Sequence, residues 1–341
     1  MSDPEFIPVT VLKRDAFSET ISGHLADQPE RRLALRKLDA LPFWSRPIAW
    51  FLARREAKAL RAVRGIEGCP TLLTASRKGI LRDWSDGTPL QLAKPSDAAF
   101  YRDAKRLLRQ MRRRGVTHND IAKPQNWLMT PDGRAAVIDF QLASVHRRRG
   151  ALFRTMARED LRHLLKQKRA YAPDLLTRAE HAMLNRKALP ARIWMATAKP
   201  LYNYVTRRLL NWSDGEGTED RLERDGPIIG QALDRPDVRA YYTCAFALPG
   251  KGVGLYTFVE TEAPEAELRQ GLPDGLPEHL QAVTRLPRTT ENRLDEAVLS
   301  LIAANRLDEV ALLTQSNPDL DRIIAPIVAD RRNLTDRILK V

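Results

Sequence analysis

The amino-acid sequence predicts a protein of mixed α and β class, with a larger basic part followed by a smaller acidic part. Its 341 residues suffice for one large domain or two smaller ones, and 43% hydrophobic residues are typical of a folded chain. Residues 222–341 hold 14 Lys and Arg against 19 Asp and Glu, a net charge of −5, which leaves +18 for residues 1–221. Helix-like and strand-like patterns of apolar residues occur in both parts.

Composition argues against several classes of protein. Cys69 and Cys244 lie 175 positions apart without a neighbouring Cys or His cluster, so we expect reduced core thiols rather than disulfides or a zinc site. The N-terminus lacks the basic and apolar run of an export signal, and no apolar stretch has the length of a membrane span. We therefore expect a cytoplasmic protein. The charge of the first part favours an anionic partner, which leaves nucleotide phosphates, nucleic acid and an acidic membrane surface open.

The first part begins with strand patterns at residues 9–12 and 33–38 and a helix pattern at 48–63. The clearest helix is predicted at 100–114, where apolar residues recur every three or four positions and arginines occupy the other, solvated side. Small and acidic residues at 212–220 predict an exposed linker, which places the domain break near residues 213–225.

Polar residues with the spacing HxDxxKxxN follow this helix directly, in the sequence HNDIAKPQN at residues 118–126. Strands are predicted at 127–130 and 134–138, and Asp132-Gly133 is a favoured pair for a two-residue hairpin turn. This register places Asn126 opposite Asp139, at roughly 5 Å between Cβ atoms. An amide oxygen and a carboxylate there suit Mg²⁺ that carries nucleotide phosphates.

Asp120 and Lys123 lie on the loop that leads into this hairpin. A carboxylate can accept the proton of an acceptor hydroxyl, and an ammonium can neutralise the oxygens of a phosphoryl group in transfer. The four residues together therefore predict phosphoryl-transfer chemistry.

These residues resemble the catalytic loop and the Asp-Phe-Gly segment of the protein kinase superfamily, and residues 10–215 or so are similar to bacterial RIO-type and lipopolysaccharide-sugar kinases. The resemblance implies a two-lobed protein kinase-like fold over residues 1–221, with an N-lobe near 1–83, a C-lobe near 90–212, and ATP and Mg²⁺ as cofactors. It implies the following roles: Asp120 as catalytic base, Lys123 at the γ-phosphate, Asn126 and Asp139 as Mg²⁺ ligands, and His118 as an anchor of the loop.

The N-lobe matches the family less closely. Residues 33–36 (LALR) are similar to the Val-Ala-Ile-Lys strand of the family, but Arg36 replaces the lysine that contacts ATP, with Glu56 as its implied partner. Lys37 follows, although strand alternation turns it to the opposite face. Residues 13–18, in the place of the nucleotide loop, contain no glycine, and residues 79–90 resemble the last N-lobe strand and the hinge.

Two features of the C-lobe leave alternatives open. The resemblance implies that Asp160 is a buried acid that braces the catalytic loop, whereas a solvated helix residue is the alternative. The basic and aromatic stretch at 147–212 suits an anionic membrane surface or an acidic substrate, and it equally suits a C-lobe core with a solvated arginine rim.

The second part predicts two strands within residues 238–259, around a turn at 249–254, and helices at 264–270 and 294–304. This small α+β domain, residues 222–304, resembles the C-terminal subdomain of adenylate-forming enzymes such as acyl-CoA synthetases. Residues 286–294 (LPRTTENRL) are similar to their Leu-Pro-Arg-Thr-x-x-Gly-Lys-Ile segment, with Asn292 for glycine and Arg293 for lysine. We expect an interaction module for a partner acyl-activating enzyme or carrier protein, followed by a helical packing tail at 305–341.

The resulting hypothesis is an ATP- and Mg²⁺-dependent kinase that phosphorylates a hydroxyl group of a protein serine or threonine or of a glycolipid sugar, in the cytoplasm or at the inner face of the membrane. The alternative is a pseudokinase scaffold, which the glycine-free loop and Arg36 favour and the complete set of catalytic residues opposes. Nucleic-acid binding has only the charge in its favour and is not expected.

Overall fold

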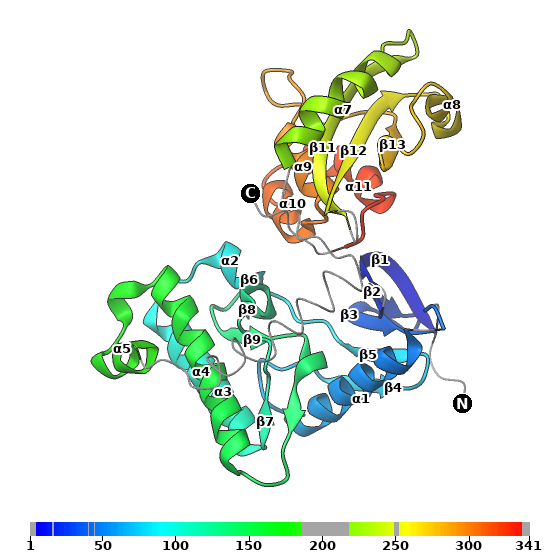
Figure 1. Ribbon diagram of the computed structural model, residues 1–341. Helices are drawn as coiled ribbons and strands as arrows, with labels where there is room; N and C mark the ends of the chain where they lie inside the picture. The colour runs from blue at the N-terminus through cyan, green and yellow to red at the C-terminus, as the bar shows by residue number, and fades with distance from the viewer. Residues whose placement is uncertain are drawn as a thin grey trace. The chain divides into compact units, whose positions relative to one another are not determined.

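The computed structural model describes residues 5–15, 17–39, 41–43, 45–185, 218–248 and 252–335. The chain divides into two compact units, residues 1–188 and 189–341. Both units contain helices and strands, so the predicted α and β class is confirmed (Figure 1). Among the described residues, no helix has both the length and the apolar character that crossing a bilayer requires.

One half of the first unit is a five-stranded antiparallel sheet with a helix packed on it (Figure 1). The predicted strands at 9–12 and 33–38 and the predicted helix at 48–63 are present, whereas the strands at 19–25 and 72–75 were not predicted. The sheet order is β1 (Phe6–Arg14), β2 (Glu19–Leu25), β3 (Gln28–Lys37), β5 (Gly79–Asp83) and β4 (Leu72–Ala75), and the helix is α1 (Arg46–Val63).

The other half of the first unit is mainly helical. Its helices are α2 (Leu90–Ala93), α3 (Ala98–Arg113), α4 (Ala151–Tyr171) and α5 (Arg178–Asn185). Helix α3 confirms the prediction at 100–114: the Asp97 side chain accepts the N–H of Ala99 at 2.9 Å, and Gly115 follows with a φ of +72°. Short strands form two small sheets, β6 (Thr88–Pro89) with β8 (Trp127–Met129) and β9 (Ala135–Val137), and β7 (Val116–Thr117) with β10 (Ser144–Val145).

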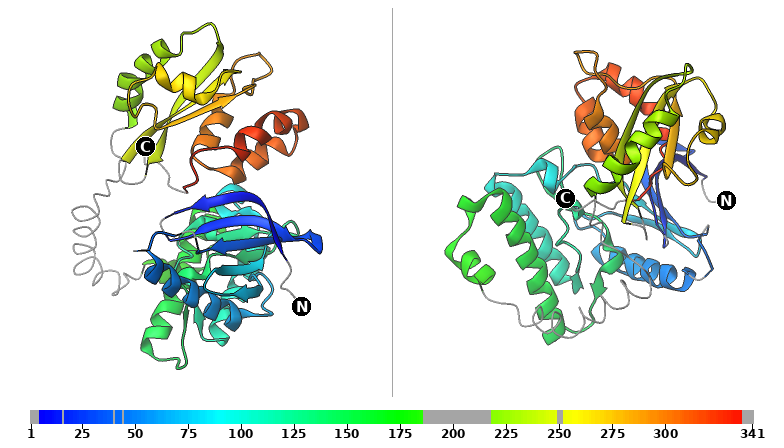
Figure 2. Two further views of the ribbon diagram at one scale, coloured as in Figure 1. Left: turned by 90° about the vertical axis from the view of Figure 1, so that its right-hand side faces the viewer. Right: turned by 45° about the horizontal axis from the view of Figure 1, so that its top comes forward.

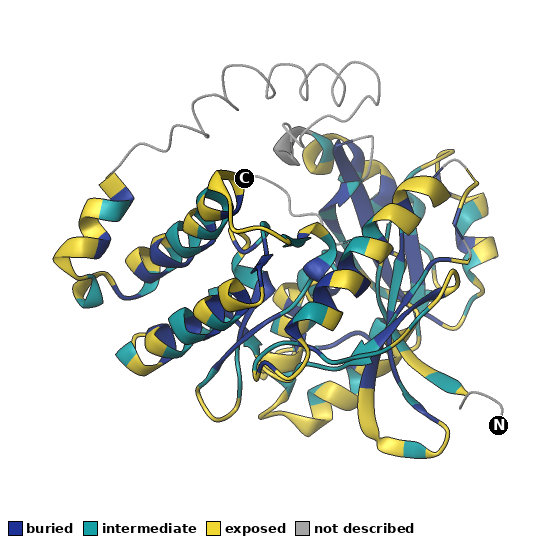
Figure 3. Cartoon of the chain, turned by 90° about the horizontal axis from the view of Figure 1, so that it is seen from below, coloured by how far each residue is buried: buried dark blue, intermediate teal, exposed yellow. Residues whose placement is uncertain are grey.

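A continuous apolar core joins the two halves of the first unit. It includes Leu60 of α1, Leu107 of α3 and Trp127 of β8, all of which are completely or almost completely buried. Figure 3 shows the same division along each helix, with buried positions on one side and exposed positions on the other. Because the loops after β7 and β9 leave from this core, it fixes where their polar residues lie.

The second unit is a three-layer arrangement around a three-stranded sheet (Figure 2). Strand β12 pairs antiparallel with β11 and parallel with β13, and it is buried along its whole length. One face packs on α7 and α8, and the other packs on α9 to α11. The elements are α7 (Thr218–Ala232), β11 (Val238–Leu248), β12 (Gly252–Thr261), α8 (Glu265–Gln270), β13 (His279–Val283), α9 (Glu296–Ala303), α10 (Leu307–Thr314) and α11 (Pro318–Ala329).

The predicted strand pair and the predicted helices at 264–270 and 294–304 are therefore present, and the tail contains two helices. Strand β13 was not predicted. The expected linker is partly wrong, because residues 218–220 already belong to α7, which packs on β11. Residues 186–217 lie outside the described residues, and so does most of the aromatic part of the 147–212 stretch.

Both cysteines are free. Cys69 packs against the core of the first unit, and Cys244 is buried in the second. Burial raises the pKa of each thiol to about 12, so both remain protonated at neutral pH, as expected of core thiols.

Candidate functional site

The loop after β7 is held by the carboxylate of Asp160 on α4. Asp160 accepts the backbone N–H of His118 at 2.8 Å and that of Asn119 at 2.9 Å. Its side chain is buried, and burial raises its pKa. Of the two alternatives left open by the sequence, the structure therefore has the buried acid that braces the loop.

His118 anchors the same loop from within the core. It is completely buried, and its Nε2 lies 2.9 Å from the carbonyl oxygen of Ile138. A carbonyl can only accept, so Nε2 carries the proton, and Nδ1 is left to accept the N–H of Asp120 at 3.4 Å. Burial lowers the pKa of His118, so the ring is neutral and suited to this pair of contacts.

Asp120, Lys123 and Asn126 form one connected group. Lys123 Nζ lies 3.0 Å from Asp120 Oδ2, and Asn126 Nδ2 donates to the carbonyl and the carboxylate of Asp120 at 2.9 and 3.1 Å. The amide nitrogen of Asn126 is directed at Asp120, and no residue in the described ranges hydrogen-bonds to its Oδ1 atom. This oxygen is therefore available as a ligand for a cation.

The predicted register of the hairpin is wrong by one residue. Trp127 pairs with Val137 and Met129 with Ala135, and the turn has three residues instead of two, with Gly133 at a φ of +77°. The hydroxyl of Thr130 accepts the N–H of Arg134 at 3.0 Å and so fixes the longer turn. With this register each residue of β8 pairs with the residue one position earlier than predicted. Asn126 therefore lies opposite Ile138 and not opposite Asp139.

Asn126 and Asp139 are nevertheless connected through Ile138, whose N–H donates to the carbonyl of Asn126 at 3.0 Å. Asp139 then leaves the strand direction with a φ of +65° at the start of the short 3-10 helix Phe140–Leu142. Gln141 donates to one of its carboxylate oxygens at 3.1 Å. Asp139 and Asp120 both lie close enough to His118 for their charges to act on its pKa, which they raise while burial lowers it.

The donors of this site fit the predicted metal in chemical type. An amide oxygen and a carboxylate are hard oxygen ligands, which Mg²⁺ prefers, and Mg²⁺ usually takes its other ligands from water and phosphate. No group of three His, Cys, Asp or Glu residues suited to a metal occurs within the described ranges. The predicted pair consists of one amide, Asn126, and one carboxylate, Asp139, and is not such a group.

Arg36 and Glu56 form a buried ion pair between β3 and α1. Arg36 donates to Glu56 at 2.6 Å, as the sequence predicted, while Lys37 points elsewhere and lies 3.9 Å from Asp39. Arg82 on β5 lies 3.8 Å from the second oxygen of Glu56 and was not predicted. Strand alternation could have suggested it, since Ala34 pairs with Arg82 and shares a face of the sheet with Arg36. Two arginines facing one glutamate leave a net positive charge.

In the loop between β1 and β2, a side chain of the loop itself accepts the backbone N–H groups. The carboxylate of Asp15 accepts the N–H of Phe17 at 2.7 Å and that of Ser18 at 2.9 Å. These are N–H groups that a phosphate-gripping loop would direct at a nucleotide. The absence of glycine in the sequence indicated a weak loop, but it did not reveal that an acid takes the donors.

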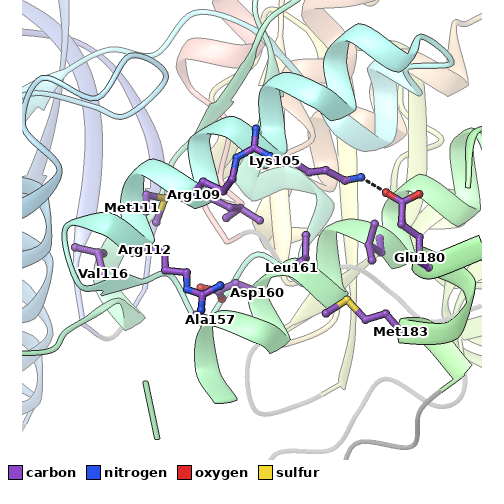
Figure 4. Close-up of a pocket in the computed structure, with 13 residues that line it drawn as sticks. Lys105, Arg109, Met111, Arg112, Val116, Ala157, Asp160, Leu161, Glu180 and Met183 are labelled. Carbon is purple, nitrogen blue, oxygen red and sulfur yellow. Dashed lines mark hydrogen bonds and ion pairs between the residues drawn. The ribbon is translucent and has the colours of Figure 1, made fainter. Parts of the chain in front are cut away.

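A cavity of about 460 Å³ lies between α3, α4 and α5 (Figure 4). Its walls are mainly apolar, and Lys105 and Glu180 form an ion pair at its side. Asp160 also lines it, so this cavity adjoins the acid that holds the loop at 118–120. Nothing in the sequence pattern predicted it, because its walls combine residues from three separate helices.

In the second unit, residues 286–294 form a turn closed by the N–H of Thr289 on the carbonyl of Arg293 at 2.7 Å. Asn292, which the resemblance aligns with a glycine, takes a φ of +62°, a conformation that asparagine adopts more readily than most residues. Arg293, in the place of the lysine, is exposed and pairs with Glu291 at 2.6 Å.

Neither the protein-family models nor the curated proteins include a match to this sequence.

Proposed function

We propose that this protein is an ATP- and Mg²⁺-dependent phosphotransferase of protein kinase-like fold that transfers the γ-phosphate to a hydroxyl acceptor. The main support is the connected group of Asp120, Lys123 and Asn126, with Asp139 directly after Ile138, whose N–H donates to the carbonyl of Asn126. A sheet with one helix, followed by a mainly helical half, is the order of elements that such a fold requires.

In this proposal each polar group has one task. Asn126 and Asp139 hold Mg²⁺, whose chemistry is to neutralise and orient the nucleotide phosphates. Asp120 accepts the proton of the acceptor hydroxyl, and Lys123 offsets the charge that develops on the transferring group. Arg36 and Arg82 together exceed the charge of Glu56, so they can also attract phosphate.

A pseudokinase scaffold is the second candidate, and the contacts of Asp15 favour it. A carboxylate that holds the N–H groups of Phe17 and Ser18 both occupies the donors and repels phosphate. In this case the protein would bind a nucleotide or a partner without turnover. The second unit is then an interaction module for an acyl-activating enzyme or carrier protein, a role that we propose for it in either case.

Transfer of radiolabelled γ-phosphate into fractionated cell protein and lipid is the experiment that tests the kinase. We expect label in one fraction, and its identity as protein or glycolipid names the acceptor class. Asp120→Asn should bind ATP as the wild type does but lose transfer by a factor of about 10² or more, because the proton acceptor and its ion pair with Lys123 are lost. Asp139→Ala should lose the Mg²⁺-dependent part of ATP binding.

Asp132→Asn is a matched control for both variants, since Asp132 lies in the turn of the same hairpin and contacts Thr130. It should retain binding and transfer. Label incorporation by Asp120→Asn at the wild-type rate would contradict the proposed role of Asp120. ATP binding without any transfer by the wild type would favour the scaffold.

A further inference from the structure

The beginning of α1 exposes large apolar side chains to solvent. Twelve large apolar residues are exposed within the described ranges, and four of them lie between residues 43 and 51. Phe43 is 82% exposed, Ile48 51%, Trp50 39% and Phe51 59%. Such a concentration is unusual for a surface that faces only water, and it marks a contact surface.

A row of cations continues this surface along α1. With 3.6 residues per turn, Arg54, Lys58 and Arg61 lie on the same face of the helix as Trp50 and Phe51. All three cations are exposed, and none has an ion-pair partner among the described residues. From Trp50 to Arg61 the surface extends about 16 Å along the axis, at 1.5 Å per residue.

The same face has no exposed acid. Glu56 is the single Asp or Glu between residues 41 and 64, and it is buried against Arg36 on the inner side of the helix. Arg55 is also engaged, because it donates to the carbonyl of Leu142 at 2.7 Å and lies 5.7 Å from the ring of Phe51. The outer face therefore combines an apolar end with uncompensated positive charge.

These properties identify the chemistry of the partner. A second copy of the chain would bring the same cations against one another in a symmetric contact, which is unfavourable. An anionic bilayer surface instead offers a plane of phosphates for the cations and an apolar boundary for the aromatic side chains. The combination of Phe, Trp and Ile with Arg and Lys on one helix is what interfacial helices present to such a surface.

We propose that the outer face of α1 docks on an anionic membrane surface. The apolar group of Phe43, Ile48, Trp50 and Phe51 enters the boundary between headgroups and acyl chains, while the cations that follow along the helix contact lipid phosphates. This site differs from the basic stretch at 147–212, for which the sequence left the same partner open as one of three alternatives. The proposal does not depend on kinase activity.

Sedimentation of the full chain with vesicles, in the absence of ATP, tests this proposal. We expect binding to an equimolar mixture of phosphatidylcholine and phosphatidylglycerol, reduced by added salt, and much weaker binding to phosphatidylcholine alone. Lys58→Glu with Arg61→Glu should weaken binding to the mixed vesicles by about tenfold or more. Phe43→Ser with Phe51→Ser should weaken it by about tenfold, since the apolar anchor is lost.

Two double variants in the second unit are matched controls. Arg285→Glu with Arg322→Glu makes the same change of charge at exposed positions, and Leu312→Ser with Leu313→Ser removes exposed apolar groups. Both should bind as the wild type does, and circular dichroism should show all variants folded. The proposal is overturned by wild-type protein that does not bind the mixed vesicles, or by α1 variants that bind them unchanged. A dimer in light scattering that only the α1 variants dissociate would also overturn it, in favour of a second copy.

Discussion

The carboxylate of Asp160 fixes the shape of the loop at 118–120 through two backbone hydrogen bonds. The peptide N–H groups of His118 and Asn119 both point at it, and Asn119 has a φ of +68°, which asparagine tolerates better than most residues. Neither N–H forms part of a helix or strand ladder, so the acid is the partner that satisfies them. The position of Asp120, the next residue, follows from this arrangement.

Asp160→Ala should lower the free energy of unfolding of the first unit by about 2–5 kcal/mol, because one buried and one partly buried N–H group lose their acceptor. Urea denaturation followed by tryptophan fluorescence reports mainly on this unit, since it contains four of the six tryptophans, and Trp194 and Trp212 lie outside the described residues. Glu159→Ala is the control: Glu159 pairs with Arg162 at 3.6 Å near the surface and should cost less than about 1 kcal/mol. Equal costs for the two variants would refute the bracing role.

At the scale of elements, the hairpin of β8 and β9 carries both candidate metal ligands beside its open end, before β8 and after β9. Its outer strand is fixed by Gly68, whose carbonyl accepts the N–H of Val137 at 2.8 Å. Gly68 has a φ of +90°, and a Cβ there would lie 2.5 Å from the carbonyl oxygen of Ala135. The backbone therefore approaches the hairpin more closely than any side chain allows.

Gly68→Ala should destabilise the first unit by at least about 2 kcal/mol more than Gly65→Ala, because a backbone atom of β9 cannot move away without breaking the hairpin. Gly65 has a similar φ of +78° but nothing within 4 Å of its Cβ position. Its substitution should cost only the backbone strain, about 1–2 kcal/mol. The comparison of the two by urea denaturation isolates the steric effect, and equal losses would show that the close approach has no energetic consequence.

At the scale of the whole molecule, the chain has two separate sets of cores. Among the described residues, the buried core that joins the halves of the first unit extends no further than position 172, and the buried clusters on the two faces of the β11–β12–β13 sheet begin at 229. Each unit therefore contains its own source of cooperative stability.

We expect the two units to unfold as separate transitions. Phe258, completely buried in the sheet of the second unit, tests this: Phe258→Ala should cost that unit about 3–5 kcal/mol. Phe258→Ala should lower the midpoint of one transition seen by circular dichroism and leave the midpoint of the tryptophan transition unchanged. Leu60→Ala in the first unit should lower the midpoint of the tryptophan transition and leave the transition of the second unit unchanged. Movement of both transitions by either variant would show that the units unfold together.

Much of the fold could be predicted from local patterns. The helix α3 and the strand pair of the second unit followed from periodicity and turn residues, and the partnership of Arg36 with Glu56 was implied by the resemblance to protein kinases. Strands β2 and β4 were not predicted, although their partner strands β1, β3 and β5 are close by in the sequence. Strand β13 pairs with β12 across a longer connection that contains α8, so local patterns do not reveal its partner.

The sequence by itself determined which side chains the site contains, since residue types and spacings are local properties of the chain. The tertiary structure decided how they meet: the turn length set the register between Asn126 and Asp139, and folding brought Asp160, Arg82 and the donors held by Asp15 into their contacts. The physical reasons differ: the register follows from the hydrogen bonds between Thr130 and Arg134 that set the turn length, whereas a buried hydrogen bond such as that of Asp160 depends on the packing of distant segments.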